Sequence, residues 1–248
     1  MELLRKLSAA GLLLLATFLY AQPTKLVLVT EVWPPYRMDD SSSPSGFSGI
    51  DIDVTLVLQE RLGIPIQIKR TPWARALDML RKGQADLISG IAWTAERAEY
   101  LRYVPTSYSA VHPMFFAPVG KGLTVQSYND LRGKSIGMST HSAYFEPFNS
   151  DSSLNKVPLS TEEQILQMLA LSRIDLAIGT DPNLSWDIAR LGHKGKVEPT
   201  AWQPPDTTPL YFAVSPLTEA TMLVQKIDQI LKEMLADGTM QKILNQYK

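Results

Sequence analysis

Residue types that carry covalent or metal chemistry are scarce in this sequence. The chain has no cysteine, which excludes thiol nucleophiles, disulfides and thiolate metal sites. Gly133-Lys134-Ser135 lacks the earlier glycine of a phosphate-binding loop, because Tyr128 stands there. No G-x-S-x-G sequence and no recognisable Ser, His and Asp spacing occurs. The histidines are far apart and lack metal-binding spacing: His112, His141 and His193. We therefore expect no metal, no cofactor and no catalytic residue.

Acidic side chains beside predicted strands offer binding chemistry instead. Glu31 directly follows the first predicted strand, and ligands of open α/β sheets sit at the carboxyl ends of strands. The alternative for Glu31 is an exposed loop carboxylate. Asp181 precedes Pro182 at a predicted helix start, which favours an N-cap role, with a ligand contact as the alternative.

Short apolar runs alternate with amphipathic helices along the chain, which is typical of layered α/β architecture. Strands are predicted at residues 25–30, 66–70, 85–91, 114–119, 134–138, 174–179 and 209–214. Helices are predicted at residues 49–62, 94–100, 181–191, 218–237 and 239–247, with two more opening at Pro72 and Ser160.

Capping patterns predict where several helices begin. Thr71 before Pro72 and Thr94 before Ala95 are expected N-caps. Ser160 with Glu163 forms the spacing of a capping box. These starts fix which side chains of each helix face the sheet.

The first residues read as an export signal, predicted at 1–21. Arg5 and Lys6 precede an apolar run over 7–19, and Ala21 offers a small residue for cleavage. The run is shorter than the roughly 20 residues that cross a bilayer, so we expect a secreted periplasmic chain that is not membrane-spanning after signal removal. A net charge of −1 gives no electrostatic reason to expect nucleic acid as a partner.

Several short motifs resemble, in order and spacing, the bacterial solute-binding proteins of family 3, the substrate-binding proteins of polar amino-acid ABC transporters. The resemblance covers nearly the whole mature chain. The motifs are Trp33-Pro34-Pro35-Tyr36, Gly49-Ile50-Asp51-Ile52-Asp53, Gly83-Gln84-Ala85-Asp86, Thr94-Ala95-Glu96-Arg97, Asp130-Leu131-Arg132-Gly133-Lys134, Arg173-Ile174-Asp175 and Ala236-Asp237-Gly238-Thr239.

This resemblance implies a periplasmic binding protein type II-like α/β fold, with two α/β lobes joined by two hinge strands. Lobe 1 would comprise residues 22–116 plus 214–248, and lobe 2 residues 117–213, with hinges at 115–118 and 211–214. It also implies a monomer that closes on a small-molecule solute, an amino acid or related carboxylate, and delivers it to an ABC transporter permease.

The resemblance assigns the main ligand contacts. Arg97 matches the arginine that receives the ligand carboxylate, a task suited to the two parallel hydrogen bonds of a guanidinium. Trp33 matches an aromatic that stacks on the ligand, and Tyr36 follows it; both could instead pack at a strand end. Gly90 and Ala92 match positions that hold the ligand head group, although Ala92 lacks the usual hydroxyl.

Three further positions leave the ligand class open. Thr180 stands where the family has an aspartate for the ligand ammonium, so Glu31 is the candidate for the missing negative charge. Ser142 matches a position beside a helix N-terminus, where it either meets an anion or only caps that helix. Arg75 suggests a second anionic group on the ligand, or is simply solvated.

Two other functions fit the same scaffold. Secreted cyclohexadienyl dehydratases resemble these proteins, and Glu31 or Asp181 would then be the acid. A periplasmic sensor subunit, which presents its ligand to a receptor, is the second alternative.

Overall fold

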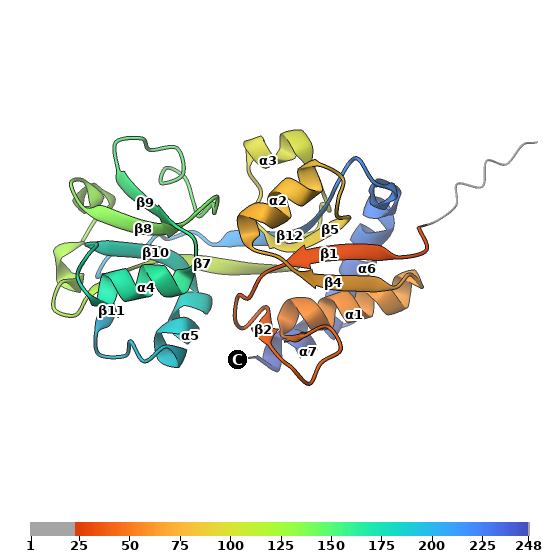
Figure 1. The fold of residues 1–248 in the computed structure, drawn as a ribbon, viewed down its shortest axis with the longest axis horizontal. Coiled ribbons are helices and arrows are strands. Elements are labelled where there is room, and N and C mark those ends of the chain that lie inside the picture. Colours follow the sequence, from red (N-terminus) through yellow and green to blue (C-terminus); the bar gives the residue numbers. More distant parts are fainter. Residues whose placement is uncertain (1–22, 248) are drawn as a thin grey trace, which may run out of the picture.

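The computed structural model describes residues 23–247, which form two α/β lobes (Figure 1). This confirms the predicted fold class. The strands of the first lobe run in the order β4-β1-β5-β12, with β6 on β12, and those of the second in the order β7-β10-β8-β9, with β11 on β7. In the first lobe these are β1 (Leu26–Thr30), β4 (Ile66–Arg70), β5 (Leu87–Ile91), β6 (Arg102–Tyr103) and β12 (Thr208–Val214). In the second they are β7 (Ser109–Pro118), β8 (Ser135–Ser139), β9 (Asn155–Leu159), β10 (Leu176–Asp181) and β11 (Val197–Pro199).

Helices cover both faces of the first sheet and one face of the second, whose other face packs against an aromatic core from turns and loops. The first lobe carries α1 (Ile50–Leu62), α2 (Trp73–Arg81), α3 (Ala95–Tyr100), α6 (Val224–Ala236) and α7 (Thr239–Asn245), and the second carries α4 (Glu162–Ala170) and α5 (Asn183–Arg190). The short elements are a hairpin of β2 (Met38–Asp39) and β3 (Phe47–Ser48), and the 3-10 turns η1 (Gly122–Thr124), η2 (Tyr128–Leu131) and η3 (Glu219–Leu223). The helix predicted over 218–237 is thus η3 followed by α6.

Alternation along the central strands builds two cores in each lobe. In β1, Leu28 packs with α1, α6 and α7, whereas Val29 faces α2. In β10, Ile178 packs with the aromatic core of the second lobe, whereas Ala177 faces α4 and α5. Side chains of successive strand residues point to opposite faces, so a strand covered on both faces reads as a continuous apolar run.

The long strands β7 and β12 connect the lobes (Figure 1). They pair antiparallel over Ser109–Val111 and Thr208–Leu210. Beyond this pairing, Phe115 belongs to the core of the second lobe and Phe212 to that of the first. We therefore propose that the chain crosses at the paired segments, a few residues before the predicted hinges; the predicted lobe boundaries stay predictions.

Three predicted helix caps are wrong, and Thr94 is confirmed, since its hydroxyl accepts the Arg97 N–H. Helix α2 begins after Pro72, and Thr71 donates instead to Lys69. Helix α4 is capped by Thr161 rather than Ser160, so the Ser160 and Glu163 box does not form. Asp181 does not cap α5, because it is still paired with His112 as the last residue of β10.

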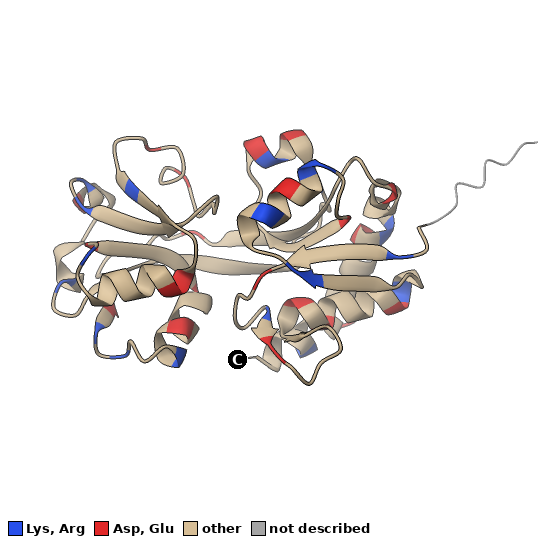
Figure 2. Cartoon of the chain, in the orientation of Figure 1, with Lys and Arg blue, Asp and Glu red and all other residues tan. Residues whose placement is uncertain are grey.

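Within residues 23–247, no helix is long and apolar enough to span a membrane. The predicted export signal lies outside the described residues. Acidic and basic residues are interspersed along both lobes in the view of Figure 2. This mixed distribution agrees with a small, local partner rather than with a polyanion.

Candidate functional site

A cavity of about 60 Å³ lies between the two lobes. Glu31 enters it from the end of β1 and Ala92 from the end of β5, while Ser142 follows β8 and Thr180 lies near the end of β10. Carboxyl ends of parallel strands from both lobes therefore converge on one space, which is the usual place for a ligand of an open α/β sheet.

Arg97 is buried in the wall of this cavity, with 4% of its surface exposed. The Thr94 cap fixes the first turn of α3 and so presents the side chain. One terminal nitrogen, Nη1, donates to the Ala92 carbonyl at 2.8 Å, and Nη2 donates to the His141 carbonyl at 2.7 Å. No carboxylate forms an ion pair with Arg97 within the part of the chain that the structure describes.

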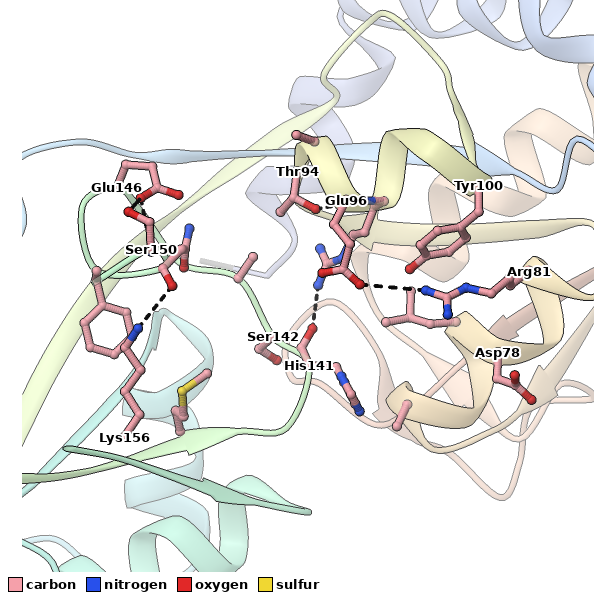
Figure 3. A pocket seen from close by; sticks show the side chains of 18 residues that line it. Asp78, Arg81, Thr94, Glu96, Tyr100, His141, Ser142, Glu146, Ser150 and Lys156 are labelled. Carbon is pink, nitrogen blue, oxygen red and sulfur yellow. Dashed lines mark hydrogen bonds and ion pairs between the residues drawn. The ribbon is translucent and has the colours of Figure 1, made fainter. Parts of the chain in front are cut away.

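His141 is one of the points at which the lobes touch. Its carbonyl accepts from Arg97 and, at 3.4 Å, from the Trp73 indole, both in the first lobe. The residue adopts φ 62°, a left-handed conformation that is uncommon outside glycine. The segment carrying His141 and Ser142 approaches α2 and α3 directly (Figure 3), so the lobes are closed on each other here.

A larger groove of about 620 Å³ opens outward from the same place. It shares Arg97 and Ser142 with the inner cavity, and its walls carry charged groups of both signs (Figure 3). Arg81 and Glu96 pair across 3.7 Å on the first-lobe wall, and Lys156 lies on the second. Beside Arg97 the larger open volume therefore lies on this outer side.

Glu31 lies inside the inner cavity, as expected of a binding carboxylate. Its Oε2 accepts the Trp73 N–H at 2.9 Å, at the first turn of α2, where free backbone donors favour an anion. Burial raises the pKa of Glu31, an effect that the Trp73 N–H and the Arg37 charge oppose. The carboxylate therefore replaces the Thr71 cap that the sequence predicts for α2.

A buried ion pair beneath the cavity was not foreseen. Arg37 and Asp51 pair with 2% and 0% of their side-chain surfaces exposed. Asp51 also accepts from Ser89 at 2.9 Å and from the Tyr108 hydroxyl at 2.5 Å. Arg37 donates onward to the Glu31 carbonyl at 3.0 Å. This network fixes the cleft side of the first lobe.

Gly90 lies against this pair and has no room for a side chain. Its φ is +65°, and an added Cβ would lie 2.4 Å from Arg37 Nη1.

We expect Gly90→Ala to lower the free energy of unfolding by roughly 2–4 kcal/mol, because backbone strain and the clash with Arg37 add together. Chemical denaturation measures it. Gly63→Ala is the control, because Gly63 has φ +70° and nothing near its Cβ direction. Equal losses in the two variants would contradict the clash.

Of the remaining predicted residues, Trp33 and Ser142 line the cavity, whereas Tyr36, Arg75 and Asp181 do not. Trp33 lines the cavity and stacks on Tyr36 with ring centroids 4.7 Å apart, but Tyr36 is buried behind it and bonds to Ser109. Ser142 lines the cavity, yet turns rather than a helix follow it, so the predicted helix N-terminus is wrong. Arg75 is exposed on α2 and Asp181 ends β10, both outside the cavity.

Glu162 is the functional candidate that sequence reasoning missed. It is the first residue of α4 and lines the cavity from the second lobe. Its Oε2 is buried without a hydrogen-bond partner, as are the Thr180 hydroxyl and both amide atoms of Asn183. Burial, followed by the nearby carboxylates of Asp187 and Glu31, raises the pKa of Glu162 to about 8. No local motif marks this residue, since its orientation depends on how α4 packs.

The fold and the cleft define a periplasmic binding protein of type II. The chain belongs to the bacterial extracellular solute-binding proteins, family 3, whose sequence model matches residues 26–248. ABC transporter arginine-binding protein 1 of Escherichia coli is 27% identical over 259 residues, covering 98% of this chain and 99% of that protein. The probable amino-acid-binding protein YxeM of Bacillus subtilis is 25% identical, covering 86% and 79%.

Solved structures share the fold at lower sequence identity. A histidine kinase sensor domain with similarity to periplasmic binding proteins superposes with a TM-score of 0.79 at 19% identity, covering 91% of this chain and 96% of that one. The amino acid ABC transporter substrate-binding protein AbpA of Streptococcus pneumoniae, bound to L-arginine, gives 0.77 at 19%, covering 90% and 94%.

Proposed function

We propose that this protein is a periplasmic carrier that binds an amino acid or related small carboxylate between its lobes and delivers it to an ABC transporter permease. The observation that carries the proposal is Arg97, a buried cation in the interlobe cavity with no carboxylate partner among residues 23–247. A buried guanidinium is stabilised by an anion, and a carboxylate matches its geometry. The relatives in E. coli and B. subtilis, an arginine-binding protein and a probable amino-acid-binding protein, support the substrate class.

Closure of the lobes is the transport step in this proposal. The ligand carboxylate meets Arg97 in the first lobe, and contacts from the second lobe then favour the closed form that the permease receives. The paired segments of β7 and β12 supply the bending points, because they carry the chain between the cores. No bond is made or broken.

A thermal-shift screen of the twenty L-amino acids, polyamines and dicarboxylates, followed by calorimetry, tests the proposal. We expect an amino acid or small carboxylate to raise the melting temperature, since a ligand at roughly 100 times its dissociation constant adds about 2.7 kcal/mol to stability. A shift produced only by polyamines, or by none of these compounds, would contradict it.

Acid catalysis on the same scaffold is the second candidate. It is favoured by Glu162, a cleft carboxyl that its surroundings keep protonated near neutral pH. Asp181 is not supported as the catalytic acid, because it is not among the residues that line the cavity. Turnover of prephenate or arogenate by the purified protein would support catalysis. If the protein turns over neither compound, the carrier function is favoured.

A further inference from the structure

Resting on the proposed function, we infer that Glu162 receives the ligand's ammonium group, opposite the carboxylate held by Arg97. The ligand class would then be amino acids rather than simple carboxylates. Thr180, at the position where the family resemblance implies an aspartate, offers only a hydroxyl. The acid would instead come from the start of α4, on the same second-lobe wall of the cavity.

Two residues of this wall have buried polar atoms without a hydrogen-bond partner, Oε2 of Glu162 and the hydroxyl of Thr180, which is 7% exposed. Behind the wall, the fully buried Asn183 amide favours the ionised form of Glu162, yet makes no bond of good geometry. Buried polar groups without partners are costly, so the two that face the cavity indicate polar atoms of a ligand. An ammonium group carries three donors and suits oxygen acceptors of this kind.

The charges around Glu162 favour a cation. Asp187 of α5 acts on it from its own lobe and Glu31 from the other, and both are negative. Arg37 of the first lobe is the positive group that lowers the pKa of Glu162, and its charge is already matched by Asp51. Asp187 is in turn paired with Arg190 at 3.0 Å. Arg97 lines the same cavity and has no ion-paired carboxylate among residues 23–247, so a ligand carboxylate at Arg97 leaves Glu31 and Glu162 to its ammonium group.

Proton release accompanies binding in this arrangement. Because the pKa of Glu162 is raised to about 8, the side chain is largely protonated in the ligand-free protein at neutral pH. A carboxylic acid must lose its proton to the buffer before it can pair with an ammonium ion. Affinity therefore rises with pH up to about 8 and falls again once the ligand's ammonium group loses its own proton, since binding needs a deprotonated Glu162 and a protonated ammonium group.

Calorimetry on the mature chain tests the assignment with L-arginine, L-glutamine and L-glutamate as probes, alongside the best amino acid from the screen. Titrations near pH 6 and about pH 8, where the ammonium groups of the probes stay protonated, report the protons released when run in buffers of different ionisation enthalpy. We expect Glu162→Gln to weaken binding by about tenfold or more at the higher pH and to remove both the pH dependence and the proton release. Glu163→Gln is the control, because Glu163 is exposed on the same turn.

Three outcomes would overturn the inference. Equal affinity and equal pH dependence for wild type and Glu162→Gln would show that Glu162 does not bind the ligand, while leaving the carrier function intact. Equally tight binding of 2-hydroxy acids, which lack the ammonium group, would show that Arg97 alone sets the ligand class. If no amino acid or carboxylate binds wild type at all, the carrier function itself fails. Melting curves of both variants verify that each is folded.

Discussion

Arg97→Ala is expected to lower ligand affinity by at least about 100-fold, because truncating one side of a buried, hydrogen-bonded charge pair costs roughly 2–5 kcal/mol or more. Arg97 is 4% exposed and its guanidinium lies against the cavity, so solvent cannot replace it as a partner for a carboxylate. Calorimetry with the best ligand of the screen measures the loss.

Two further variants separate charge from geometry and from general effects. Arg97→Lys keeps the charge but loses the planar fork, so we expect a smaller but clear loss. Arg75→Ala is the matched control, because Arg75 is exposed on α2 outside the cavity. Wild-type affinity in Arg97→Ala would contradict the assigned role, as would an equal loss in Arg75→Ala.

Arg97 also holds the lobes together, which adds a second readout. Its Nη2 bonds to the His141 carbonyl at 2.7 Å, whereas the Trp73 indole reaches the same carbonyl only at 3.4 Å. Loss of the stronger contact is expected to favour an open ligand-free form, seen as a larger radius of gyration by small-angle scattering. A hydrogen bond made in the closed state shifts the balance toward that state, so its loss favours the open one.

Local sequence patterns predict the framework because they depend on neighbouring residues. The strand over 66–70 agrees residue for residue with β4, and the helix over 49–62 begins one residue later as α1. Arg97 belongs to the same class of prediction, since the Thr94 cap lies within one turn of it. Its partner His141, 44 residues away, follows from no such pattern.

The predictions that failed did so because contacts between residues far apart in the sequence outweigh the local pattern. The Asp181-Pro182 pattern suits a cap, but pairing of Asp181 with His112 keeps it in β10. Thr71 does not cap α2, because Glu31, 42 residues earlier than Trp73, already accepts the first N–H. Glu162 was missed for a related reason: a glutamate at a helix start is usually solvated, and only the packing of α4 against the cleft buries its Oε2.

Asp51→Ala is expected to destabilise the protein by about 3–5 kcal/mol, because it leaves the Arg37 charge buried without a partner. The loss also removes the acceptor of Ser89 and of the Tyr108 hydroxyl. Urea denaturation followed by circular dichroism measures it. Asp39→Ala is the control in the same lobe, since the Arg70 and Asp39 side chains are 51% and 67% exposed, and such surface pairs contribute little. Similar midpoints for the two variants would show that burial does not set the strength of the Arg37 and Asp51 pair.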